Sequence, residues 1–117
     1  MQVQVHTDSN YEGGESLAEH VTTVVEKTLG RFSDRITRVE VHLTDESSRE
    51  KSGGDDKRCA MEARVGGLKP IAVTHDSATV IQAISGAADK LETAIERTLG
   101  KLGNVKGRTS FGGDQTI

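Results

Sequence analysis

Hydrophobic residues recur along this chain with two different spacings, and the changes between them mark the predicted elements. Residues 2–6 and 36–44 alternate apolar with polar positions, which is typical of strands that bury one face. The same alternation recurs at 58–65, and a short apolar segment follows at 71–74. The sequence therefore predicts four strands.

Two further segments repeat their apolar residues every three or four positions, which is the spacing of an amphipathic helix. The first runs from Glu15 to about Gly30, with acids near its start and bases near its end, as the helix dipole favours. The second follows Asp76 or Ser77, either of which is a suitable N-cap, and continues to Leu102. The predicted order of elements is β-α-β-β-β-α.

One apolar face on each strand and one apolar stripe on each helix predict an α+β fold. Two helices packed on one face of a four-stranded, mostly antiparallel sheet would bury all of these apolar surfaces. The other face of the sheet would be open to water. The residues predicted on that open face are Gln2, Gln4, His6, Arg38, Glu40, His42, Glu62, Arg64 and Thr74.

The length of 117 residues fits one folded domain. We expect residues 1–102 to form it, and the Gly-rich, polar residues 103–117 to be a flexible C-terminal tail. Residues 45–57 contain no apolar side chain and are expected to form a solvated loop between two strands. The pair Gly66 and Gly67 predicts a hairpin turn.

The composition disfavours membrane and secreted proteins. No apolar run approaches the ~18 residues that a membrane span needs, and the N-terminus lacks the basic start and apolar stretch of a signal peptide. Cys59 is the only cysteine, so no internal disulfide can form, and we expect it to be a small buried hydrophobe. These features predict a cytoplasmic protein that does not act at a membrane.

No group of residues has the spacing of a known catalytic or cofactor site. The histidines are His6, His20, His42 and His75. They form no HExxH or His-x-His motif, and the Gly-Gly pairs match neither a phosphate loop nor a dinucleotide fingerprint. We therefore expect no enzyme activity, no cofactor, no metal site and no small-molecule substrate. His6 and His42 would become neighbours if their strands pair, which leaves an enzyme built on these two residues as a minor alternative.

Basic residues gather near the C-terminal ends of the two predicted helices, although the net charge of the chain is −3. If the first helix connects parallel neighbouring strands, both helices run in the same direction and these ends lie at one edge of the domain. Complementing the helix dipole explains only the basic residues inside the helices. A site for an anionic polymer would also explain the others. This basic pole consists of Lys27, Arg31, Arg35, Arg38, Arg97, Lys101, Lys106 and Arg108.

Two segments carry a resemblance to a known family, FSDRITRVEVHL at 32–43 and VIQAISGAADKLETAIERTLGKL at 80–102. The positions that carry it are Phe32, Arg35, Ile36, Val39 and Val41 in the first segment and Ala83, Ile84, Gly86, Asp89, Lys90 and Leu91 in the second. Together with the order of elements, they resemble the bacterial ribosome-hibernation family in its short form. That family includes the hibernation-promoting factor and the ribosome-associated inhibitor.

The resemblance implies a translation inhibitor without catalytic activity, and the predicted architecture is dsRBD-like. Family members bind the small ribosomal subunit in the channel for messenger and transfer RNA, and contact ribosomal RNA through basic residues on both helices. In this sequence that role would fall to Lys90, Arg97 and Lys101 on the second helix. Lys27 and Arg31 would take it on the first. The implied partner is the small subunit and its rRNA, and the implied result is ribosome hibernation.

The charges on the second helix leave another interpretation open. Glu92 and Glu96 dilute its basic residues, and Thr93 stands where family members typically carry an arginine. The alternative is a divergent, non-enzymatic protein-interaction or regulatory module of the same fold that no longer binds ribosomes. Such a module would use the acidic first helix or the open sheet face.

Overall fold

The computed structural model of the chain describes residues 1–7, 14–45 and 57–107, with the backbone alone after Lys101. Its elements are β1 (Gln2–Thr7), α1 (Gly14–Thr28), a short 3-10 helix η1 (Gly30–Phe32), β2 (Ile36–Asp45), β3 (Lys57–Val65), β4 (Ile71–Ser77) and α2 (Val80–Gly107). The predicted β-α-β-β-β-α order and the α+β class are confirmed. None of the described helices is both long and apolar enough to span a membrane.

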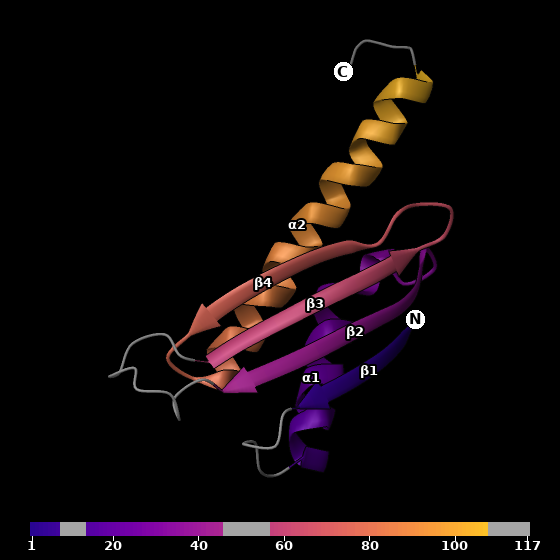
Figure 1. Cartoon of the computed structure of the whole chain (residues 1–117). Coiled ribbons are helices and arrows are strands. Elements are labelled where there is room, and N and C mark those ends of the chain that lie inside the picture. The colour runs from indigo at the N-terminus through magenta and orange to yellow at the C-terminus, as the bar shows by residue number, and fades with distance from the viewer. Residues whose placement is uncertain (8–13, 46–56, 108–117) are drawn as a thin grey trace.

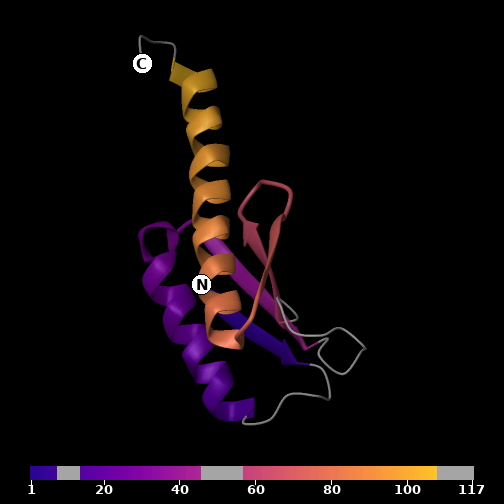
Figure 2. The ribbon, with the colours of Figure 1, turned by 90° about the vertical axis from the view of Figure 1, so that its left-hand side faces the viewer.

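The four strands form one sheet in the order β1-β2-β3-β4. β1 runs parallel to β2, whereas the β2–β3 and β3–β4 pairs are antiparallel, as the sequence predicted. Both helices lie on the same face of this sheet (Figure 1). They lie side by side and run in the same direction (Figure 2), with α2 over β3 and β4 and α1 toward β1.

Aliphatic side chains fill the space between the helices and the covered face of the sheet. The buried residues are Val21, Val25, Leu29, Phe32, Ile36, Val39, Val41, Leu43, Cys59, Met61, Ala63, Val65, Ala83, Ile84, Ala87, Ala88, Leu91 and Ile95. Burying an aliphatic side chain of this size contributes about 1.5–3 kcal/mol, so this layer is the main source of stability. Burial also raises the pKa of the Cys59 thiol to about 12, which keeps it protonated and unreactive at neutral pH.

The start of α2 differs from the prediction. Asp76 and Ser77 belong to β4, because pairing with β3 continues past Thr74 to the end of both strands. Thr79 is the N-cap instead, and its Oγ1 accepts a hydrogen bond of 3.1 Å from the backbone N–H of Gln82. N-cap propensity alone did not show which of these polar residues begins the helix, because the pairing of β4 with β3 decided where α2 could start.

The end of α2 also lies beyond the expected boundary. The helix has 28 residues, or about 42 Å at 1.5 Å per residue, and continues past Leu102 to Gly107. Its C-terminal part extends past the sheet (Figure 1). The loop was expected at 45–57, but Asp45 and Lys57 are paired residues of β2 and β3, so the strands extend further than expected. Residues 46–56 and the remainder of the expected tail, 108–117, lie outside the described residues.

Two glycines are placed where a side chain would not fit the backbone or the packing. Gly67 has a φ of 79°, and the N–H of Leu68 donates to the carbonyl of Val65 at 3.0 Å, which confirms the predicted β3–β4 turn. Gly86 brings α2 against β4, because a Cβ on this residue would lie only 2.7 Å from Cγ of His75. Gly86 therefore sets the distance between helix and strand.

Candidate nucleic-acid interface

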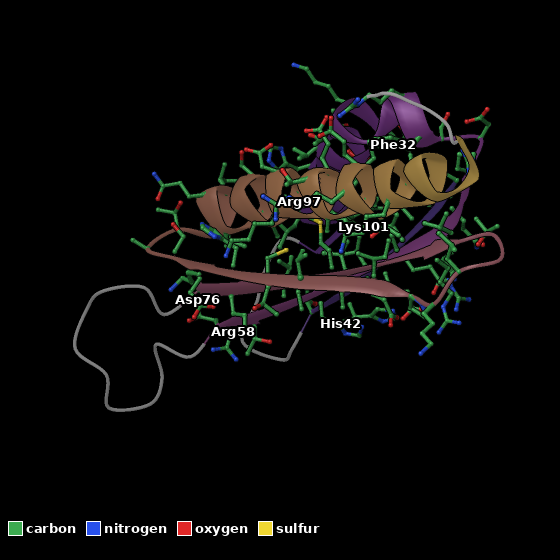
Figure 3. All side chains as sticks on the ribbon, turned by 90° about the horizontal axis from the view of Figure 1, so that it is seen from above. Phe32, His42, Arg58, Asp76, Arg97 and Lys101 are labelled. Carbon is green, nitrogen blue, oxygen red and sulfur yellow. The ribbon has the colours of Figure 1, made fainter. Side chains whose placement is uncertain are left out.

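A row of three basic residues follows one side of α2. Lys90, Arg97 and Lys101 are separated by seven and four positions, so they lie one above another on the helix surface. All three are exposed, and the row extends for about 16 Å along the helix. Arg97 and Lys101 lie on the helix layer, across the sheet from His42 (Figure 3). We call these three residues the α2 basic row.

Two members of this row are available for an external anion. Arg97 and Lys101 make no ion pair with any residue that the structure describes. Lys90 donates from Nζ to the backbone carbonyl of Thr74 at 3.0 Å, which ties the start of the row to β4. Between these residues lies an open depression of about 340 Å³, lined by Asp89, Lys90, Thr93, Ala94 and Arg97. The row thus borders a shallow concave surface with mostly positive charge.

Two acids of α2 point away from the row, whereas Asp89 lines the depression beside Lys90 and Arg97. Glu92 and Glu96 face η1, where each has a carboxylate oxygen 3.4 Å from the guanidinium of Arg31. Arg31 also stacks on the Phe32 ring, with its Cζ 4.5 Å from the ring centroid. Arg31, one of the residues of the predicted basic pole, therefore pairs with both of these acids. These contacts leave the opposite side of α2 with unmatched positive charge.

The other predicted RNA-binding residues are not all brought to this surface. Lys27 and Arg35 are exposed at the end of α1 and just before β2. Arg38 lies on the open face of the sheet, across from the helices, where its Nη2 contacts a Glu40 oxygen at 3.0 Å. Lys106 is described by its backbone in α2 only, and Arg108 lies outside the described residues.

The open face of the sheet carries matched charges. Arg58 donates to both carboxylate oxygens of Asp76, at 2.9 and 3.3 Å, and a weaker contact of 3.9 Å joins Arg64 to Glu62. The hydrogen bond from Arg58 lowers the pKa of Asp76, against a smaller opposing effect of desolvation. Each of these bases has an acid beside it, so this face offers a polyanion less unmatched positive charge than α2 does.

The two histidines of the open face lie together, as expected for paired strands. His6 and His42 occupy equivalent positions in the β1–β2 ladder, and their rings stack with centroids 4.7 Å apart and planes 16° apart. Glu40 lies beside them, with a carboxylate oxygen 3.9 Å from Nε2 of His42. Glu40 was not predicted to join the two histidines. The signal was the Glu-x-His spacing on a strand, which puts both side chains on one face.

The comparison with protein-family models shows which family the chain belongs to. The family model described as "Sigma 54 modulation protein / S30EA ribosomal protein" matches residues 3–103. The chain belongs to this family. The predicted resemblance to ribosome-hibernation factors is thereby confirmed, and the chain is a member of a ribosome-associated family. A comparison with curated protein sequences finds no match.

Solved structures of similar shape agree with the fold. The N-terminal domain of Protein Y from Thermus thermophilus superposes with a TM-score of 0.66 at 21% identity, covering 84% of this chain and 99% of that domain. A ribosomal subunit interface protein from Coxiella burnetii gives 0.65 at 17% identity, covering 86% and 99%. At such identities the similarity establishes a shared fold for this family member.

Proposed function

We propose that this protein binds small-subunit ribosomal RNA in the channel for messenger and transfer RNA, and so inhibits translation and promotes ribosome hibernation. The observation that carries the proposal is the α2 basic row, which presents unmatched positive charge in a member of a ribosome-associated family. A protein in this channel would sterically exclude messenger and transfer RNA. The proposal requires no cofactor, no small molecule and no chemistry, and it places the protein in the cytoplasm.

The charge arrangement accounts for how a chain of net charge −3 would bind a polyanion. Affinity for nucleic acid depends on the bases that reach phosphates and on the counterions that they release, rather than on total charge. Arg97 and Lys101 are exposed for such contacts, while Glu92 and Glu96 are held by Arg31 on the other side of α2. Contacts of this type read backbone shape, which suits A-form RNA.

The contribution of the row is tested by cosedimentation of the full chain with purified small subunits across a salt series. The double reversal Arg97→Glu with Lys101→Glu should weaken binding at least about hundredfold at ~50 mM salt and flatten its salt dependence. The matched control is Arg58→Glu with Arg64→Glu, which changes the net charge equally on the open sheet face. This control should bind within a few-fold of the wild type, and thermal melts establish that both variants fold.

Two outcomes would overturn the proposal. Absence of wild-type binding at ~50 mM salt, where electrostatic contacts are strongest, would favour the alternative of a protein-interaction module that has lost the ribosome. Equal loss of binding in both double variants would show that the α2 basic row has no special part.

A further inference from the structure

We propose that His6, Glu40 and His42 form a binding site for a divalent transition metal, with Zn²⁺ the best-suited ion. One ligand atom from each residue lies within 4.8 Å of those from the other two. Two imidazoles and one carboxylate are a set that zinc accepts, with a fourth position left for water or for a ligand from a partner. The proposal departs from the sequence-based expectation of no metal site, which rested on the absence of a local motif.

The strands fix the spacing of the three ligands. β1 and β2 are parallel neighbours, and His6 and His42 are direct partners in their register. Adjacent strands lie ~4.8 Å apart, so the two histidine Cβ atoms start from positions that one ion can bridge. Glu40 precedes His42 by two residues and shares its face of β2. The ligand set thus rests on two hydrogen-bonded strands rather than on a loop.

Only side-chain rotation is needed to complete the site. Zinc bonds of ~2.1 Å in tetrahedral geometry place ligand atoms roughly 3.4 Å apart, so the atoms must approach by about 1 Å. The His42 side chain is 55% exposed and has room to turn. The rings stack with planes 16° apart, and rotating them would aim one nitrogen of each at a common point. The backbone would not have to move.

Arg38 prepares the carboxylate for this role. Its Nη2 contacts Oε2 of Glu40 at 3.0 Å, while Oε1 of the same carboxylate faces Nε2 of His42 at 3.9 Å. A partner that holds one oxygen and leaves the other free is the usual support for a metal ligand. The positive charge of Arg38 opposes a bound cation. The site should therefore favour ions that bind imidazole strongly, such as Zn²⁺, over Mg²⁺ or Ca²⁺, which prefer oxygen ligands.

The metal site is separate from the proposed RNA surface. His42 lies on the side of the sheet opposite Arg97 and Lys101 (Figure 3). Variants at the histidines leave the α2 basic row intact, and variants of the row leave the histidines intact. A failure of either proposal is therefore distinguishable from a failure of the other.

Calorimetric titration of ZnCl₂ into the full chain tests the site. We expect one ion per chain, at least a tenfold loss of affinity in His6→Gln and in His42→Gln, and a measurable loss in Glu40→Gln. The matched control His20→Gln removes a histidine from α1 and should leave the affinity unchanged. MgCl₂ should give no saturable heat.

NMR spectra of the wild type provide a measurement that needs no variant. Zn²⁺ should shift the imidazole signals of His6 and His42 and leave those of His20 and His75 in place. Absence of saturable Zn²⁺ binding would overturn the proposal. So would binding that survives the His6→Gln/His42→Gln double variant, or shifts confined to the other two histidines.

Discussion

The two faces of the sheet are built from alternate residues of the same four strands, yet they have different roles in the molecule. The covered face holds Val39, Val41 and Met61, each almost fully buried under the helices. The open face holds Arg58 and Glu62, two residues of β3 that are in contact with water and carry opposite charges. Stability is concentrated on one face, and charged side chains that water already solvates occupy the other.

This comparison explains why the unmatched charge is found on the outer side of a helix. On this sheet, Arg38 and Arg64 each lie near an acid two positions along their own strand, and Arg58 pairs with an acid on the neighbouring strand. On α2, Glu92 and Glu96 are separated from the α2 basic row around the helix axis and turn toward Arg31, while Asp89 stays near Lys90 and Arg97. The outer side of α2 can therefore keep a net positive charge that the open sheet face does not show. Three predictions test the contrast, in order of expected effect.

Met61→Ala and Glu62→Ala compare the two faces at adjacent residues of β3. Met61 is buried in the core, so its truncation should lower the free energy of unfolding by about 2–5 kcal/mol. Glu62 lies on the open face, and its replacement should change that free energy by about 0.5 kcal/mol or less. Urea denaturation measures both values. Similar losses at the two positions would contradict the division of the sheet into a stabilising and a solvated face.

Gly86→Ala tests how closely α2 packs on the covered face. Alanine normally favours a helix, but here its Cβ would enter the space of the His75 ring. We expect a net loss of about 1–3 kcal/mol in the free energy of unfolding, because overpacking outweighs the gain in helix propensity. Gly100→Ala is the matched control in the same helix, since its Cβ would meet nothing within 4 Å. That control should raise the free energy of unfolding by up to about 1 kcal/mol. A Gly86→Ala variant that is more stable than the wild type would show that the contact between residue 86 and His75 is not tightly packed.

Arg58→Gln tests a charge pair of the open face and should have the smallest effect. Arg58 lowers the pKa of Asp76, so the pair stabilises the fold above the ordinary carboxyl pKa and loses this contribution as pH falls through the lowered value. At pH 7 we expect the variant to lose about 0.2–1 kcal/mol, since both side chains are exposed to solvent. The difference from the wild type should shrink as pH falls through the lowered pKa and vanish once Asp76 is protonated in both the folded and the unfolded state.

Denaturation at pH 7 and at low pH measures this dependence. An NMR titration should also show that the pKa of Asp76 is higher in Arg58→Gln than in the wild type. Arg97→Gln serves as the control, because Arg97 makes no ion pair among the described residues and its loss should not alter stability at either pH. An Asp76 pKa that stays low in Arg58→Gln would assign the shift to another cause.

The local pattern of hydrophobic and polar residues was sufficient to predict most of the fold and part of the candidate sites. Alternation at Val39 and Val41 and the helical spacing of Ile84, Leu91 and Ile95 identified core positions, because period and burial are directly linked. The members of the α2 basic row were named from the family resemblance, and their spacings of seven and four put them on one side of the helix. The parallel pairing of β1 with β2, which was predicted only as a condition, is what the structure shows, and a crossover helix between the two strands allows it.

Contacts between segments distant in the sequence were decided by the tertiary structure alone. Pairing with β3 assigned Asp76 to a strand and moved the N-cap to Thr79. The position of η1 beside α2 gave Glu92 and Glu96 a partner in Arg31, which separated these two acids from the α2 basic row. A periodic pattern records which side of an element is buried, but it carries no information on which side chain of another element lies opposite. For this protein the sequence by itself determined the elements, the core and the family, and the fold determined which charges are matched and which ligands meet.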